Sequence, residues 1–310
     1  MMKNISIVGT GLIGCSIGLG VKTMFKSIAG FDINPQNLDY ALKTGMITQS
    51  WSIERIAYES DIIIVAVPVD VALTIIPDIL NKIKGDTVVI DVGSTKSSIC
   101  RVVKDHPKRD RFIAAHPMAG SEIGGPQGSR EDLFNGRTAI ICQSEQSSVF
   151  GLNQAKEIFR MLGMTIDYMN EDTHDSLVAL VSHLPQIVSY GIANTVGQSM
   201  NGNQQWCGIA AGGFDSSTRL AKSLAEVWTP VLMQNKRHIS EYLQLFIHQI
   251  ETIKELIDVD DAEAINRFIH QSQVVREKFD NNSNGNKEKK DGSKTIVRTG
   301  ATAAVASGIK

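Results

Sequence analysis

Three glycines near the start of the chain are spaced so that they can bind a dinucleotide. Gly9, Gly11 and Gly14 form the pattern G-x-G-x-x-G, directly after a short apolar run and before a second apolar stretch. In a strand–turn–helix context, such a turn brings backbone amides at the helix N-terminus close to a pyrophosphate. The predicted cofactor site contains these glycines and two residues that the motif encloses, Leu12 and Ile13.

An acidic residue completes the dinucleotide pattern. Asp32 ends the next expected strand, residues 27–31, where a carboxylate can accept hydrogen bonds from ribose hydroxyls. Its negative charge would repel a 2′-phosphate, which favours NAD over NADP. Val67 and Pro68, which end a later strand, are assigned to the same site. Alternatively, Asp32 only caps the helix that begins near Pro35.

Two further polar side chains follow expected strands. Ser94, in the sequence DVGSTK, comes after the buried strand at 87–92, and His116, in HPMAGSE, comes after the strand at 112–115. Ligands of an open parallel sheet bind at the carboxyl ends of its strands, so both side chains can reach cofactor or substrate. A histidine held extended by the proline that follows it is suited to act as a general base. Ser94 could equally cap the next helix, as Thr95 could.

The C-terminal half contains two less specific candidates. His183, in SHLPQ, lies within an apolar helix that Pro185 is expected to kink, and a lone histidine there is more often a hydrogen-bonded core residue. Arg219 begins a helix after a glycine pair, and its planar guanidinium suits a carboxylate, although most helical arginines are simply solvated. Trp228, in the same helical sector, is more typical of a core residue than of a substrate contact.

The composition is that of an ordinary globular protein. The 310 residues are 42% hydrophobic and 21% charged, and the formal net charge of −2 offers no excess for binding nucleic acid or an anionic membrane. Apolar runs such as 62–69 are too short to span a bilayer, and no signal peptide precedes the first strand. The scattered cysteines Cys15, Cys100, Cys142 and Cys207 indicate reduced thiols, and no metal site is predicted. We therefore expect a cytoplasmic protein.

The elements that must position these residues alternate along the first half of the chain. Strands are expected at 3–10, 27–31, 46–49, 61–68, 87–92, 112–115, 138–142 and 165–168, with helices between them. This alternation predicts an α/β fold with a doubly wound parallel sheet. Within the helix at 71–83, Pro77 is expected to cause a break.

Beyond residue 171 the pattern becomes helical. Helices are expected at 173–198, 217–234, 237–257 and 262–280. The first is unusually apolar for a surface helix, which predicts that this part of the chain forms a homodimer; a monomeric helical cap is the alternative. The polar and small residues of 281–310 predict a flexible tail. The expected domains are thus an NAD-binding domain at 1–170, a helical substrate and dimerisation domain at 171–280, and the tail.

Taken together, these pieces resemble the prephenate/arogenate dehydrogenase family of tyrosine biosynthesis. The resemblance runs from Ile5 to about Phe279 through GTGLIG, Asp32, DVGSTK, HPMAGSE, SHLPQ and GGFDSSTRLA, in that order. It implies a Rossmann-like domain followed by an all-α dimerisation domain. It also implies NAD(P)-dependent oxidative decarboxylation of prephenate to 4-hydroxyphenylpyruvate, or of arogenate to tyrosine.

The resemblance also implies a role for each matching residue. His116 would accept first a hydrogen bond and then the proton of the ring C4 hydroxyl, while Ser94 would hold the same hydroxyl. The implied substrate contacts are His183, Arg219, Glu122 and Ser121. Of these, Arg219 would bind a carboxylate, His183 would position the substrate from the helical domain, and Glu122 would gate or polarise the pocket.

Three alternatives remain open at the level of sequence. Prephenate is favoured over arogenate, because no carboxylate in the matched motifs obviously awaits the ammonium group of arogenate, although Glu122 or Asp215 could supply one. A β-hydroxyacid dehydrogenase would use a lysine of the helical domain, yet neither Lys222 nor Lys236 lies in a convincing G-x-x-x-K pattern. A binding module that senses NAD without catalysis is the third alternative, and the intact His116 and Arg219 argue against it.

Overall fold

The computed structural model describes residues 4–25, 27–200, 202 and 205–295. The chain divides into two compact units, Met1–Leu243 and Gln244–Lys310. This division falls inside a helix, whereas the sequence changes character near residue 170; the three domain ranges expected from sequence stay a prediction.

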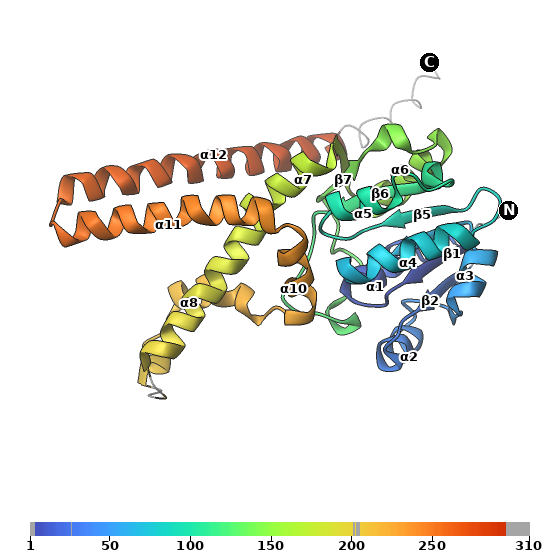
Figure 1. The fold of residues 1–310 in the computed structure, drawn as a ribbon, viewed down its shortest axis with the longest axis horizontal. Coiled ribbons are helices and arrows are strands. Elements are labelled where there is room, and N and C mark those ends of the chain that lie inside the picture. Colours follow the sequence, from blue (N-terminus) through green and yellow to red (C-terminus); the bar gives the residue numbers. More distant parts are fainter. Residues whose placement is uncertain (1–3, 26, 201, 203–204, 296–310) are drawn as a thin grey trace, which may run out of the picture. The chain divides into compact units, whose positions relative to one another are not determined.

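A single sheet forms the centre of the described part of the first unit (Figure 1). Its strands lie in the order β3-β2-β1-β4-β5-β6-β7-β8. The strands are β1 (Asn4–Val8), β2 (Ser27–Phe31), β3 (Gln49–Ser50), β4 (Ile62–Val65), β5 (Val88–Asp91), β6 (Phe112–Pro117), β7 (Thr138–Cys142) and β8 (Thr165–Met169). Because β1 pairs with both β2 and β4, the winding reverses there, and ligands of such sheets bind beside this switch point.

The sequence predicts a parallel sheet, but the observed sheet contains one antiparallel pair of strands. Strand β7 is antiparallel to β6, and β8 runs parallel to β7. The connection at 118–137 contains only the short 3-10 turn Pro126–Gly128 and no crossover helix, so the chain re-enters the sheet from the edge at which it left. His116 lies within β6 near its carboxyl end, one residue inside the strand rather than after it.

Helices cover both faces of the sheet. They are α1 (Leu12–Val21), α2 (Pro35–Lys43), α3 (Ile53–Glu59), α4 (Val69–Lys82), α5 (Ser97–Val103) and α6 (Val149–Met161). Successive residues of β4 alternate between two buried clusters, which explains its unbroken apolar sequence: Ile62 and Ile64 belong to one and Ile63 to the other. Helix α4 continues through Pro77, so the break expected there is wrong; its buried face packs on either side of the proline.

The helical part of the first unit contains two interruptions. Helix α7 (Glu171–Val178) leads through a π-helical turn, Ala179–His183, into α8 (Leu184–Met200), where the sequence predicts one helix. Pro185 has no N–H to donate to the carbonyl four residues earlier, inside the π turn. The helix expected at 217–234 is likewise divided into the end of α9 (Gly212–Thr218), a 3-10 turn, Arg219–Lys222, and α10 (Ala225–Gln234).

The stretch Glu171–Met200 is long and apolar enough to cross a membrane, by length and composition only, with 28% of its most apolar window buried. Polar residues interrupt this stretch, so no apolar run in the sequence predicts a membrane-spanning helix here. The stretch carries the buried side chains His174, Asp175 and His183, which are hydrogen-bonded inside the protein. We therefore interpret it as a core helix whose other face is exposed in the single chain.

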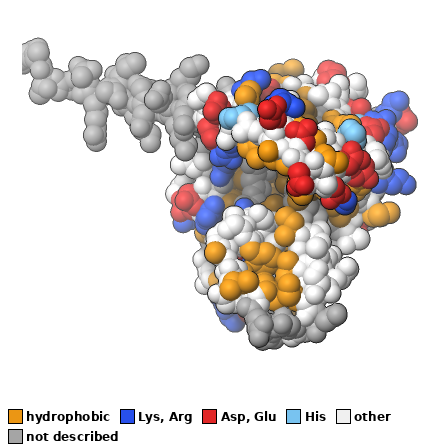
Figure 2. All heavy atoms as spheres, turned by 90° about the vertical axis from the view of Figure 1, so that its left-hand side faces the viewer, with side chains coloured by type: hydrophobic (Ala, Val, Ile, Leu, Met, Phe, Trp, Pro, Cys, Tyr) orange, Lys and Arg blue, Asp and Glu red, His pale blue; other side chains and the backbone are white. Residues whose placement is uncertain are grey.

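Apolar side chains remain exposed on the helical part of the first unit. They include Val181, Met200 and Ile209. Figure 2 shows hydrophobic side chains gathered on the face near the end of α8. Such a patch is typical of a surface that another molecule covers.

The second unit begins within α11 (Lys236–Asp258) and continues with α12 (Ala262–Thr295). Helix α12 continues through Asp280, where the sequence predicts the start of a flexible tail, as far as Thr295; the flexibility expected of residues 281–310 stays a prediction. The rest of the predicted tail, 296–310, lies outside the described residues. Several large apolar side chains of this unit are exposed, among them Leu245, Ile250 and Phe279.

Candidate active site

The glycine turn between β1 and α1 has the shape that a dinucleotide requires. Gly9 has φ +97°, and a Cβ there would lie 2.4 Å from the carbonyl oxygen of Ala66. A Cβ on Gly14 would lie 2.0 Å from the carbonyl oxygen of Gly9, so the helix packs directly on the turn. Beside Gly11, in contrast, the space within 4 Å is open. No side chain caps the N-terminus of α1, which leaves room and free amides for a pyrophosphate.

Asp32 is held at the edge of this turn. Its Oδ2 accepts hydrogen bonds from the backbone N–H of Thr10 at 2.7 Å and from the Thr10 hydroxyl at 3.0 Å. Its Oδ1 accepts one from the N–H of Asn34 at 2.8 Å and keeps a lone pair for a further donor. Val67 and Pro68 precede α4 close by, since a Cβ on Gly9 would lie 3.1 Å from a methyl of Val67. The glycine turn, Asp32 and Val67 thus lie close together, and their arrangement fits NAD.

A buried ion pair underlies the next part of the site. Lys96 is fully buried, and its Nζ pairs with the carboxylate of Asp91 and donates to the carbonyl of Ala115 at 2.7 Å. Lys96 closes the sequence DVGSTK, and Ala115 precedes His116, so the pair fixes two neighbouring strand ends. Ser94, between Asp91 and Lys96, is half-buried and makes no hydrogen bond with the described residues. The pair therefore connects the ends of β5 and β6.

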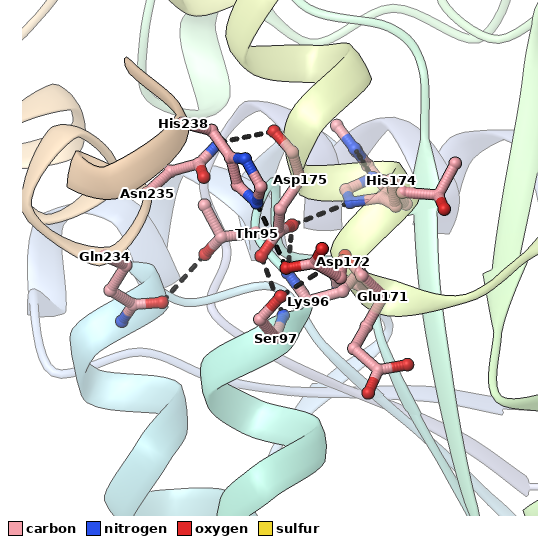
Figure 3. A network of polar contacts seen from close by, with 12 residues as sticks. Thr95, Lys96, Ser97, Glu171, Asp172, His174, Asp175, Gln234, Asn235 and His238 are labelled. Atoms are coloured by element: carbon pink, nitrogen blue, oxygen red, sulfur yellow. Dashed lines mark hydrogen bonds and ion pairs between the residues drawn. The ribbon is translucent and has the colours of Figure 1, made fainter. Parts of the chain in front are cut away.

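His116 is hydrogen-bonded to a second histidine. Its Nδ1 lies 2.8 Å from Nε2 of His174, and Nδ1 of His174 lies 2.8 Å from Oδ1 of Asp175. Asp175 also accepts the backbone N–H groups of Lys96 and Ser97, both at 2.8 Å (Figure 3). A chain of contacts thus leads from β6 through α7 to the N-terminus of α5.

Burial keeps both histidines uncharged. It lowers the pKa of His116 well below the ordinary value, and the neighbouring His174 and the charge of Lys96 lower that pKa further. Burial also lowers the pKa of His174, against the opposite effect of Asp175. Burial would raise the pKa of Asp175, but the hydrogen bonds from His174, Lys96 and Ser97 outweigh it and hold the pKa at about 2. At neutral pH the group is a carboxylate next to two neutral imidazoles.

His183 occupies a core position. Its Nδ1 lies 3.2 Å from Nδ2 of Asn235, and its ring meets that of Trp228 edge to face, with centroids 5.8 Å apart. Nδ2 of Asn235 also donates to the backbone carbonyl of Asp175 at 2.6 Å. Burial lowers the pKa of His183 to about 4. This environment is that of a hydrogen-bonded core histidine, and a direct substrate contact of His183 stays a prediction.

Two of the predicted substrate residues contact each other. Nη1 of Arg219 lies 2.8 Å from Oε2 of Glu122, with the arginine side chain 50% exposed. Glu122 belongs to the loop after β6, and Arg219 begins the 3-10 turn after α9. Ser121 accepts a hydrogen bond from the N–H of Ile123 at 3.1 Å and lies on the exposed part of the same loop.

Two family models match the chain. The prephenate dehydrogenase nucleotide-binding domain matches residues 17–168, and the prephenate dehydrogenase dimerization domain matches residues 170–271. The chain belongs to the prephenate dehydrogenase family. Membership confirms the expected order of an α/β nucleotide-binding domain and a helical domain. The first model begins at residue 17, so the role of the glycine turn depends on the geometry above.

Individual relatives agree with this assignment. The chain is 29% identical over 282 residues to the prephenate dehydrogenase of Bacillus subtilis, covering 89% of this chain and 76% of the relative. It is 24% identical to the cyclohexadienyl dehydrogenase of Zymomonas mobilis, covering 89% and 96%. A crystal structure of prephenate dehydrogenase from Aquifex aeolicus, with hydroxyphenyl propionate and NAD+, superimposes with a TM-score of 0.82 at 26% identity, covering 90% of this chain and 99% of that one.

Several residues of the site were not anticipated. His174 and Asp175 lie in the first turn of the helix expected at 173–198, where no role is predicted for them. Lys96 is the last residue of DVGSTK, and only Ser94 and Thr95 of that motif are assigned possible roles from sequence. Asn235 carries no sequence signal of its own. A histidine and an aspartate in succession, nine residues before the histidine of SHLPQ, were the available sign of a buried polar group.

We predict that alanine at Gly9 chiefly lowers stability, whereas alanine at Gly11 chiefly weakens NAD binding. Gly9→Ala should lower the free energy of unfolding by about 2 kcal/mol or more, because a side chain meets both an unfavourable φ and a backbone oxygen. Gly11→Ala should cost at most about 1 kcal/mol but weaken NAD binding at least tenfold, roughly, because its methyl occupies the open space. Urea unfolding and calorimetric titration with NAD measure the two effects. Unchanged NAD affinity in Gly11→Ala would contradict the assignment.

We also predict that Lys96→Met destabilises the protein by about 3–5 kcal/mol, because it leaves the Asp91 carboxylate buried without its cation. The matched control is Lys104→Met, at the exposed end of α5, with an expected change within about 0.5 kcal/mol. The double variant Asp91→Asn/Lys96→Met should recover part of the loss. Equal urea midpoints for Lys96→Met and Lys104→Met would refute the role of the pair.

Proposed function

We propose that this protein is an NAD-dependent prephenate dehydrogenase, which converts prephenate to 4-hydroxyphenylpyruvate by oxidative decarboxylation in tyrosine biosynthesis. The observation that carries the proposal is a neutral, half-buried histidine at the carboxyl end of β6, hydrogen-bonded on one side, in a chain of this family. The name of the Bacillus subtilis relative and the ligands of the Aquifex aeolicus structure support the substrate class and the cofactor.

His116 acts as the base. The reaction turns the ring C4 hydroxyl of prephenate into a carbonyl, so one proton must leave that oxygen. A neutral imidazole at hydrogen-bond distance can accept it. Bound NAD supplies the acceptor for the hydride from ring C4. Loss of the ring carboxylate as CO2 then leaves its bonding electron pair in the ring, which becomes an aromatic phenolate, and the phenolate oxygen takes the proton back from His116 to give 4-hydroxyphenylpyruvate. Because the ring becomes aromatic, the loss of CO2 requires little acid catalysis. Ser94, half-buried after β5, holds the same hydroxyl in this proposal.

Arg219 binds a carboxylate of the substrate. Its Nη1 already donates a hydrogen bond to Oε2 of Glu122, which supports a carboxylate as the ligand of this guanidinium. Half of the side chain is exposed, so a ligand can compete for or share this contact. Glu122, and Ser121 beside it, would then line the entrance to the pocket. His183 would support the substrate from the helical domain, through the core contacts that it makes.

Prephenate fits this site better than arogenate. An ammonium group needs a carboxylate that no protein cation already occupies. Glu122 pairs with Arg219, and Asp215 lies 4.0 Å from Nζ of Lys222. Both candidate carboxylates have a cationic neighbour in the free protein, and this favours prephenate in our proposal. The Asp32 carboxylate similarly favours NAD, because a 2′-phosphate would meet its negative charge.

The assembled enzyme is a cytoplasmic homodimer in this proposal. The dimerization-domain match and the exposed apolar side chains of α8 support a second copy as the partner of the helical part. Sedimentation or light scattering would report the mass. A monomer at all concentrations would contradict the dimer without affecting the proposed reaction.

The deciding experiment follows NADH formation with prephenate, arogenate and a set of 3-hydroxy acids as separate substrates, with NAD or NADP. Turnover of prephenate with NAD supports the proposal. Turnover of arogenate alone would reassign the substrate, and turnover of a hydroxy acid alone would favour a β-hydroxyacid dehydrogenase. NAD binding without any turnover would favour the non-catalytic binding module.

We predict that His116→Asn lowers kcat by roughly two to four powers of ten while KM for prephenate stays within about threefold. In the wild type, kcat/KM should persist as the pH falls through 6.5 and decline only at lower pH, because burial lowers the pKa of the base and its neutral form is the active one. His106→Asn, in the connection between α5 and β6, is the control and should leave both parameters unchanged. An unchanged kcat in His116→Asn would refute the role of the base.

We predict that Arg219→Ala raises KM for prephenate by at least about tenfold and changes kcat less, because a contact of the bound substrate is lost. Arg160→Ala, on the exposed side of α6, serves as the control. Steady-state kinetics with prephenate separate the two parameters. A steady KM with a collapsed kcat would show that Arg219 acts on the reacting atoms instead.

A further inference from the structure

Behind His116 lies a chain of acceptors that the reaction proposed above does not itself require. Oδ1 of Asp175 receives the backbone N–H of Lys96 and faces Nδ1 of His174, while Oδ2 receives the N–H of Ser97. Both carboxylate oxygens are thus used as acceptors by groups that can only donate. This arrangement requires an ionised carboxylate at Asp175.

The charge on Asp175 determines where the protons of the two histidines lie. An ionised carboxylate cannot donate, so Nδ1 of His174 must carry a hydrogen. His174 is fully buried and neutral, so its Nε2 has a bare lone pair. Nδ1 of His116 lies 2.8 Å from that lone pair and must therefore be the donor. In a neutral imidazole the other nitrogen is then bare, which leaves Nε2 of His116 free to accept a proton.

We propose that His174 and Asp175 are positioning residues that fix the tautomer of His116, with its hydrogen on Nδ1 and its lone pair on Nε2. This inference rests on the proposed function only for the use to which Nε2 is put. The tautomer itself follows from three hydrogen bonds and the chemistry of a carboxylate. Neither residue needs to touch the substrate for this role.

The carboxylate is itself held from several elements. Two backbone amides at the start of α5 bind its oxygens, and the backbone carbonyl of Asp175 accepts a hydrogen bond at 2.6 Å from Asn235, the residue that follows α10. Figure 3 shows Asp175 between Lys96 and Ser97 on one side and Asn235 on the other. Because a backbone amide holds each of its two oxygens, the carboxylate is kept directed toward His174.

The same chain also stabilises the product of proton transfer. When His116 accepts the hydroxyl proton on Nε2, its Nδ1–H still points at His174, and the positive charge lies two hydrogen bonds from the Asp175 carboxylate. A neutral imidazole between a cation and a carboxylate polarises toward both. The positioning chain therefore lowers the cost of forming an imidazolium inside the protein.

Two variants of His174 separate this role from simple packing. His174→Phe keeps a ring but removes both nitrogens, so Nδ1 of His116 loses its acceptor. His174→Gln places an amide oxygen where Nε2 was, and that oxygen can accept the same hydrogen bond. His106→Gln, in the connection between α5 and β6, is the matched control.

The first readout is the tautomer, measured by NMR of the protein with 15N-labelled histidine at neutral pH. Signals of His116 are those missing from His116→Asn. We expect a protonated Nδ1 in the wild type and in His174→Gln, and a change towards protonated Nε2 in His174→Phe. Protonated Nε2 on His116 in the wild type would overturn the inference, whether or not the protein oxidises prephenate.

The second readout is kinetic and applies once wild-type turnover has been measured. His174→Phe should lower kcat by roughly 10- to 10⁴-fold, the upper figure being the effect of a wrong imidazole tautomer in a Ser-His-Asp triad. KM should change little, and His174→Gln should restore kcat to within about tenfold of the wild type. Wild-type kcat in His174→Phe, or equal losses in both variants, would overturn the inference. An inactive wild type with the expected tautomer would instead count against the proposed function alone.

Discussion

The buried pair of Asp91 and Lys96 is the interaction on which the candidate active site depends. A lysine without solvent needs both a counter-charge and a further acceptor, and here they come from the ends of two adjacent strands. The backbone of the same lysine binds Asp175. One residue thus fixes the strand that carries His116 and the carboxylate that orients it. Its removal would leave an unpaired charge in the core and loosen both ends of the site at once.

The Asp32 carboxylate, beside the glycine turn, is also held in place by its neighbours, but by hydrogen bonds rather than by a buried ion pair. Thr10 and Asn34 hold the Asp32 carboxylate through three hydrogen bonds, so its direction is set before any ribose arrives. Preorganised groups lose little entropy on binding. At the other end of the site, Arg219 and Glu122 are paired on a partly exposed surface, where an ion pair contributes little to stability and is easily exchanged for a ligand. The glycine-turn end and the Arg219 end of the site therefore differ in rigidity, as the roles proposed for them require.

Local sequence could predict the parts of this protein that local rules determine. Spacing and periodicity predict the glycine turn, the buried strands and the place of His116 near a strand end. The role expected of Arg219 comes from the family resemblance instead. The contact of His116 with His174 could not be predicted, because 58 residues separate them and the intervening strand β7 turns against the expected direction. The lysine of DVGSTK has no pattern that marks it as buried, since its partner charges become neighbours only when β5 and β6 pair. Long-range polar contacts need the three-dimensional fold.

The π turn at Ala179–His183 lies between two parts of one helical stretch whose buried side chains contact different neighbours. It contains one residue more than an α turn, so the side chains beyond it are rotated by about 100° relative to an uninterrupted helix. His174 and Asp175, before the turn, face β6 and α5, whereas His183, at its end, faces Trp228 of α10 and Asn235 after it. One extra residue in a helical turn is therefore enough to direct the buried polar side chains of a single stretch toward two different parts of the fold.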